Sequence, residues 1–325
     1  MNSRFTVAAV YALMCLIWGT TWLAIKIGLH SMGPLTGVGL RFLLAGVLLF
    51  GVAALRGELR PISKLPWKLI AVFAVFTFAC DYTLLYIGET RVDSGLASVL
   101  FGTLPFFTFG FARVLANERL TWRAAAGSLA AFSGVALISL GGGVHGSPLY
   151  ALAPIGAAIA AAFATAYAKR APAVSPLASL PPAMTIAGTA MLAAGLVFER
   201  TDWSQATSPA SLGALLYLAV AGSGIAFFCM LWLLERLPAG TIGLSSLTFP
   251  IIALTVGALF GGEHVGTREL AGSALVIIGM AIAMLTSFVR RGSLRPLLAT
   301  QSCNDPFAAV SNERARERER TAGVL

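Results

Sequence analysis

The feature that most constrains the fold is a series of ten apolar segments, each about as long as a membrane-crossing helix. A helix needs roughly 20 mainly apolar residues to cross a bilayer. Of the 325 residues, 57% are hydrophobic and 11% are charged, whereas soluble domains carry about 25% charged residues. We therefore predict an all-α membrane protein with ten transmembrane helices. The segments are 5–29, 34–55, 67–88, 94–115, 122–140, 148–168, 178–198, 209–234, 239–260 and 268–289.

The distribution of Lys and Arg predicts the orientation. With a cytoplasmic N-terminus, 18 of the 23 basic residues fall on the cytoplasmic side, three in outer loops and two inside segments. Cytoplasmic loops of membrane proteins are enriched in Lys and Arg, so both termini are predicted to be cytoplasmic. The net charge of +9 then reflects topology and contact with the lipid bilayer, and no nucleic-acid partner is predicted.

An internal repeat divides the chain into two halves. Five residues recur at a spacing of 145 positions, and each half contains five apolar segments. Because five is odd, the second half is predicted to be inverted relative to the first. The predicted domains are the repeats 1–142 and 147–289, followed by a polar cytoplasmic tail, 290–325, which we expect to be disordered. The repeated residues are Pro105, Glu118, Gly127, Ser128 and Gly134, matched by Pro250, Glu263, Gly272, Ser273 and Gly279.

Inverted repeats are typical of secondary transporters, whose substrate site lies between the two halves near the bilayer midplane. The repeat therefore predicts alternating access to a small-molecule substrate.

Several motifs resemble the drug/metabolite transporter superfamily, and in particular its bacterial EamA-type members. The resemblance implies a multi-pass transporter of the cell inner membrane, usually an exporter of amino acids, metabolites or drugs. It also implies a cavity lined mainly by the first, third, fourth, sixth, eighth and ninth segments. At the position of Trp18 the second half has Ala161, so the aromatic residue is not repeated. The motifs are Trp18-Gly19-Thr20-Thr21, the run from Leu40 to Gly46, Ser94-Gly95-Leu96-Ala97-Ser98 and Asn117-Glu118-Arg119-Leu120-Thr121.

Asp81 is the only carboxylate well inside an apolar segment. Ionisable residues inside membranes usually face the bundle interior or a wet cavity and mark functional sites. We predict either that Asp81 takes up protons for coupling or binds a substrate ammonium group, or that it pairs with Arg41 or Lys26 to hold helices together.

Two sets of charged residues are candidates for gates. Lys26, Arg41 and Glu89 lie at similar depth toward the outer side, where ion pairs among them could close an outer gate. The alternative is that the two cations snorkel to the headgroups. Lys169 and Glu235 lie toward the cytoplasmic side as candidates for an inner gate.

Aromatic and hydroxyl-bearing residues complete the candidate cavity. Stripes at helical spacing contain Trp18 and Trp22, and Tyr82 and Tyr86. Such stripes either pack or line a cavity, and a cavity suits their polar atoms better. Pro105 and Pro250 are predicted to lie inside helices, where each would free a backbone carbonyl as a hinge, as a binding site or as a static kink. The remaining cavity candidates are Thr103, Pro105, Trp232, Ser246 and Pro250.

Two further sets of residues are predicted to be structural. Glycines seven positions apart permit close helix contact, and Glu118 and Glu263 are expected to stabilise the starts of the helices that follow them. The glycine pairs are Gly39/Gly46, Gly127/Gly134, Gly188/Gly195 and Gly272/Gly279.

No enzyme, cofactor or metal site is predicted. His30, His145 and His264 lie far apart in outer loops, and no nucleotide-binding or hydrolase motif occurs. The preferred function is export of small amphipathic metabolites, amino acids or drugs. The alternatives are a uniporter or exchanger of phosphorylated or sugar metabolites, or a non-transporting membrane sensor that uses the charged tail. The sequence leaves the oligomeric state open.

Overall fold

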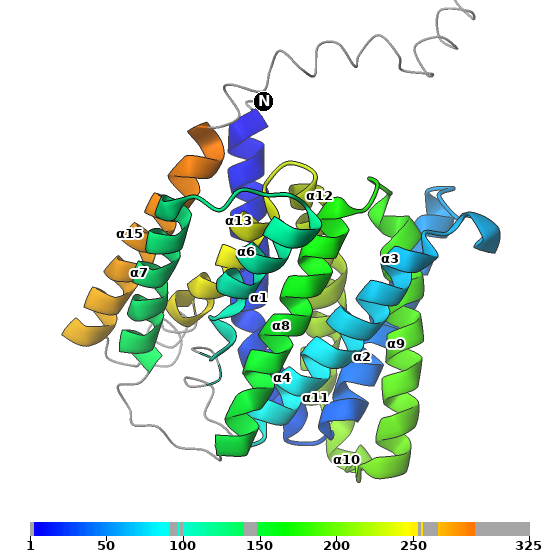
Figure 1. Cartoon of the computed structure of the whole chain (residues 1–325). Coiled ribbons are helices and arrows are strands. Elements are labelled where there is room, and N and C mark those ends of the chain that lie inside the picture. Colours follow the sequence, from blue (N-terminus) through cyan, green and yellow to red (C-terminus); the bar gives the residue numbers. More distant parts are fainter. Residues whose placement is uncertain are drawn as a thin grey trace, which may run out of the picture. The chain divides into compact units, whose positions relative to one another are not determined.

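The computed structural model describes residues 3–91, 97, 100–139, 148–252, 255 and 266–289, and every regular element within these ranges is helical (Figure 1). The α-helices are α1 (Ser3–Leu29), α2 (Pro34–Leu55), α3 (Trp67–Val72), α4 (Tyr82–Glu89), α6 (Leu104–Leu115), α7 (Trp122–Ser139), α8 (Pro148–Arg170), α9 (Pro176–Phe198), α10 (Trp203–Ala206), α11 (Pro209–Tyr217), α12 (Ala226–Leu234), α13 (Ala239–Gly243) and α15 (Thr267–Val289). The remaining helical segments are η1 (Ile62–Lys64), η2 (Phe73–Asp81), η3 (Leu218–Ile225) and η4 (Leu244–Thr248).

Within the described residues, six of the ten predicted spans are helices long and apolar enough to cross a membrane. Shorter apolar helices cover Leu104–Leu115, Ala239–Ile252 and Leu270–Ala283 within other predicted spans. An all-helical membrane protein is therefore confirmed, and the total of ten spans stays a prediction. The six are Phe5–Leu29, Pro34–Leu55, Trp67–Glu89, Leu152–Arg170, Pro176–Phe198 and Pro209–Leu234.

α2 and α9 make an extensive contact and lie side by side (Figure 1). Gly39 of α2 faces the backbone of Leu192, and Gly188 of α9 faces the backbone of Leu43. A side chain at either glycine would collide with the opposite helix. The same kind of contact thus occurs twice, once with a glycine of α2 against α9 and once with a glycine of α9 against α2. The predicted packing role of these glycines is confirmed.

The same reciprocal pattern joins α7 and α15. Gly127 lies against the Gly279 carbonyl, and Gly134 lies against the Gly272 carbonyl and the Val276 backbone. The glycine pairs predicted on these helices are thus also contact residues.

Carboxylates stabilise both ends of the α2–α9 pair. The Glu199 carboxylate accepts hydrogen bonds from the backbone N–H groups of Leu35 and Thr36, each at 2.8 Å. These N–H groups lie in the first turn of α2, where they have no partner within the helix. Near the start of α9, Ser175 Oγ donates to Glu58 Oε2 at 2.7 Å.

Two of the long spans contain π-helical segments. Within Trp67–Glu89, η2 begins at Phe73, and within Pro209–Leu234, η3 begins at Leu218, 145 positions later. In a π-turn each N–H bonds to the carbonyl five residues back, so the helix is locally widened, and such turns are frequent at functional sites. Asp81 is the last residue of η2.

The structure corrects the prediction that Pro105 interrupts a helix. A turn at residues 102–103 precedes Pro105, which is the second residue of α6. A proline in the first turn removes no intrahelical hydrogen bond. Pro250, in contrast, lies inside the continuous apolar helix Ala239–Ile252, just after its 3₁₀ segment η4, so the prediction of an intrahelical proline is confirmed at this position.

The prediction for Glu118 also needs correction. Its carboxylate accepts hydrogen bonds from the backbone of Ala239 at 2.9 Å and of Gly240 at 3.5 Å. It therefore satisfies the first turn of α13, more than a hundred residues away, and not the start of α7. Glu263 lies outside the described residues.

Candidate functional site

A pocket in the described part of the chain opens between α1, η2, α4, α6, α8, α12, α13 and η4. It contains about 730 Å³ of empty space, its open mouth included. These elements belong to the six segments for which the family resemblance implied a cavity, and that this pocket binds the substrate stays a prediction. The lining residues are Trp18, Thr21, Trp22, Ile25, Thr77, Asp81, Tyr82, Leu85, Phe101, Leu104, Ala161, Thr165, Phe227, Met230, Ile242, Gly243, Ser245 and Phe249.

Aromatic rings form most of the wall. The centroid of Trp22 lies 6.2 Å from that of Phe101 and 6.5 Å from that of Phe249. Trp18 meets Phe227 edge to face at 5.4 Å. Such packed rings present a rigid apolar surface, which suits a ligand with an apolar or aromatic part.

Two polar anchors hold Trp18 and Thr21 at the pocket. Trp18 Nε1 donates to the Gly222 carbonyl in η3 at 3.2 Å, and Thr21 Oγ1 donates to the Trp18 carbonyl at 2.6 Å. The indole N–H is thus satisfied by the π-helical segment.

Asp81 brings a carboxylate to this apolar pocket. Its side chain is 5% exposed, and its Oδ1 atom has no hydrogen-bond partner among the described residues. Burying a carboxylate without a partner is costly, so this oxygen is suited to accept a hydrogen bond from a ligand or to take up a proton.

Arg41 is fully buried against Tyr82. Its Nε donates to Ser223 Oγ at 2.8 Å, and its Nη1 lies 3.5 Å from the Tyr86 hydroxyl. Its guanidinium stacks 4.5 Å from the Tyr82 ring centroid. Gly222 leaves room for this guanidinium, because a Cβ there would lie 3.1 Å from Nη2. The snorkelling alternative is therefore wrong for Arg41, and the cation interacts electrostatically with Asp81 without an ion pair.

The candidate outer gate has no ion pair in this conformation. Lys26 is exposed, and Glu89 has one buried oxygen without a hydrogen-bond partner. Lys26 and Glu89 interact electrostatically, but no ion pair joins Lys26, Arg41 and Glu89 in the described part of the chain. Closure of an outer gate by these residues stays a prediction.

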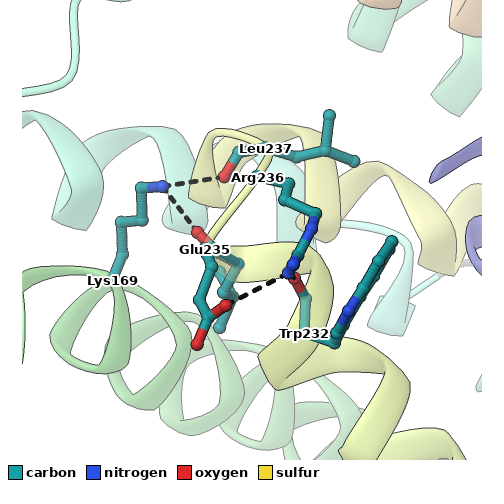
Figure 2. A network of polar contacts seen from close by, with 6 residues as sticks. Lys169, Trp232, Glu235, Arg236 and Leu237 are labelled. Atoms are coloured by element: carbon teal, nitrogen blue, oxygen red, sulfur yellow. Dashed lines mark hydrogen bonds and ion pairs between the residues drawn. The ribbon is translucent and has the colours of Figure 1, made fainter. Parts of the chain in front are cut away.

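At the candidate inner gate, Lys169 lies against the end of α12, as Figure 2 shows. Its Nζ donates to the carbonyls of Leu234 at 2.6 Å and Leu237 at 3.0 Å. Glu235 forms an ion pair with Arg236 at 3.1 Å, and the Arg236 guanidinium stacks 3.8 Å from the Trp232 ring centroid. Trp232 therefore belongs to this surface network.

The structure brings four of the predicted cavity residues together in the pocket lining: Trp18, Trp22, Asp81 and Tyr82. Tyr86 contacts Arg41 instead, beside a smaller cavity. Outside the described lining lie Thr103, Pro105, Trp232, Ser246 and Pro250, although their neighbours Leu104, Ser245 and Phe249 line it.

Sequence reasoning missed several lining residues from the second half, notably Phe227 and Met230. Phe227 is the approximate repeat counterpart of Asp81, and its ring meets those of Trp18 and Phe78. Repeat position was the signal that could have identified it.

A family model described as the EamA-like transporter family matches the chain twice, at residues 6–140 and 148–285. The chain belongs to the EamA-like transporter family. It is a membrane transporter, as its apolar helices and this membership require.

Similar proteins extend over nearly the whole EamA-like chain. "Uncharacterized inner membrane transporter YedA" of Escherichia coli (strain K12) is 29% identical, covering 86% of this chain and 91% of its own. "Probable terminal-alkyne amino-acid exporter" of Streptantibioticus cattleyicolor is 31% identical, with 87% and 95% covered. A solved crystal structure with 20% identity superposes with a TM-score of 0.71, covering 88% of this chain and 98% of its own, and supports the fold alone.

Proposed function

We propose that this EamA-like transporter is a secondary transporter that exports small amphipathic metabolites, amino acids or drugs, by alternating access. The substrate carries an ammonium group that binds Asp81 and an apolar part that packs against Trp18 and Trp22. The protein resides in the cell inner membrane with both termini cytoplasmic, as the distribution of basic residues favours.

The observation that carries the proposal is the buried Asp81 carboxylate at an aromatic pocket. Its Oδ1 atom lacks a hydrogen-bond partner among the described residues. An ammonium group supplies both the missing donors and a compensating charge, and aromatic faces attract cations as well. A proton that binds Asp81 in exchange for the substrate would couple export to a proton gradient.

Alternating access is supported by the reciprocal contacts between α2 and α9. Gly39 meets Leu192 as Gly188 meets Leu43, and the family model matches each half once. These observations favour two inverted five-helix repeats, 1–142 and 147–289, that exchange conformations. A substrate with an amino group also agrees with the name of the Streptantibioticus relative.

Transport by the full chain in proteoliposomes tests this proposal. We expect uptake of apolar amino acids or cationic aromatic drugs that responds to an imposed pH gradient. Asp81→Asn should reduce it at least about tenfold, since charge-assisted hydrogen bonds contribute about 1.5–3 kcal/mol. Asp202→Asn, a change at an exposed carboxylate outside the spans, should leave it unchanged. Normal transport by Asp81→Asn would refute the assigned role.

A phosphorylated substrate would need cationic ligands inside the membrane, and Lys26 and Arg41 are the two basic residues inside the predicted spans. Neither belongs to the described pocket lining, so the proposal does not adopt this alternative. The sensor alternative depends on the tail 290–325, which lies outside the described residues. Transport that survives truncation of the tail would exclude it.

A further inference from the structure

A second concave site lies on the surface of α2, η3 and α12. It is an apolar groove with about 780 Å³ of empty space, its open side included. Leu48 and Val52 of α2 and Val220 of η3 form its rim, and each side chain is about two fifths exposed, at 42%, 39% and 41%. Arg56 is the one charged residue in the described lining.

The groove runs along membrane-spanning helices. Its α2 side extends from Ala45 to Arg56, which corresponds to roughly 16 Å of helix at 1.5 Å per residue. One leaflet contributes about 15 Å to a hydrocarbon core that is about 30 Å thick. The groove is therefore about as long as one leaflet, and acyl chains are the apolar molecules that surround it there.

The end of the groove carries the positive charge. Arg56 follows the last residue of α2 and is exposed, Arg60 and Lys64 follow in the same connection, and Lys68 lies in the first turn of α3. A guanidinium offers paired donors that match the geometry of a phosphate group. Basic residues at a membrane surface also attract anionic lipids.

We propose that this groove binds one acyl chain of an anionic phospholipid whose phosphate contacts Arg56. The floor of the groove includes Gly224 of η3. The same π-helical segment accepts the Trp18 hydrogen bond at Gly222 and the Arg41 hydrogen bond at Ser223. A bound lipid therefore touches the segment that positions the aromatic wall of the pocket.

Native mass spectrometry of the full chain in detergent tests the headgroup contact. Phosphatidylglycerol and phosphatidylcholine with identical acyl chains are the probes. We expect one retained phosphatidylglycerol, with about tenfold lower retention of phosphatidylcholine. Arg56→Gln should lower the retention of phosphatidylglycerol to that of phosphatidylcholine. Arg60→Gln, in the same loop but outside the described lining, should leave the retention of phosphatidylglycerol unchanged. Equal losses in both variants would overturn the proposal, because they would indicate general attraction to the basic loop.

A second pair of variants tests the acyl-chain contact. Val52→Trp fills the groove and should reduce retention of both lipids at least about fivefold, as expected when several buried CH₂ groups are displaced. Val47→Trp adds the same side chain to α2 at a position that is 55% exposed and outside the described lining, and should retain the lipid. Retention by Val52→Trp at the wild-type level would overturn the proposal. So would a dimer that Val52→Trp abolishes, because a second copy would then occupy the groove.

Discussion

Arg41 of α2 donates a hydrogen bond from its Nε to the Oγ of Ser223 in η3 over 2.8 Å. The two residues lie 182 positions apart and are both fully buried. Ser223 Oγ in turn donates to the Leu218 carbonyl at 2.9 Å. The cation of the first half is thus held by a π-helical segment of the second half.

Ser223→Ala should therefore destabilise the protein by about 1–3 kcal/mol, because it leaves a buried charged donor without its acceptor. The thermal midpoint of the purified protein measures this loss. Ser133→Ala is the matched control, since the exposed Ser133 hydroxyl bonds within its own helix, and its midpoint should stay near that of the wild type. Equal midpoints for the two variants would mean that the Arg41 contact contributes nothing.

Gly188→Val should impair folding, because a Cβ at this position would collide with the backbone of Leu43. Overpacking of a close contact costs about 1–3 kcal/mol and occasionally more. Gly51→Val on α2 is the control, because nothing lies within 4 Å of a Cβ there. Size-exclusion chromatography and thermal unfolding should show aggregation or a lower thermal midpoint for Gly188→Val but not for Gly51→Val. A monodisperse, stable Gly188→Val protein would contradict the prediction.

Trp22→Ala should raise the apparent KM for an apolar substrate about tenfold, since it removes the ring that meets Phe101 and Phe249. Trp22→Phe should retain most of the affinity. Trp122→Ala removes an indole that is 75% exposed and lies outside the described lining, so its KM should be unchanged. Initial rates in proteoliposomes provide the comparison, and equal KM values for Trp22→Ala and the wild type would place the substrate elsewhere.

Features that depend on local periodicity were predictable from the sequence. Six of the predicted apolar segments agree closely with observed helical spans, and glycines seven residues apart mark the contact faces of α2 and α9. The aromatic stripe of Trp18 and Trp22 likewise indicated a pocket wall. Each of these features is a residue spacing along a single helix, and such a spacing is visible in the sequence.

Features that depend on partners far away in the sequence were not predictable. Burial of Arg41 requires the space left by Gly222, and Glu118 binds the backbone of Ala239. No spacing rule connects such residues. Ion pairing at a gate also changes with the conformation of a transporter, so sequence indicates only which charges are available.

Lys169→Met should weaken the junction between α8 and the end of α12, because Lys169 Nζ donates to the carbonyls of Leu234 and Leu237. Cations stabilise helix C-termini, where backbone carbonyls lack partners within the helix. We expect a loss of about 1–3 kcal/mol in stability and partial rescue in Lys169→Arg, which keeps the charge and the donors. Arg170→Met, at the exposed neighbouring position, is the matched control. Cysteine crosslinking between positions 169 and 237, whose residues are in contact, should slow in the presence of substrate if this junction opens during transport. Identical crosslinking rates with and without substrate would make Lys169 a static structural residue and exclude it from an inner gate.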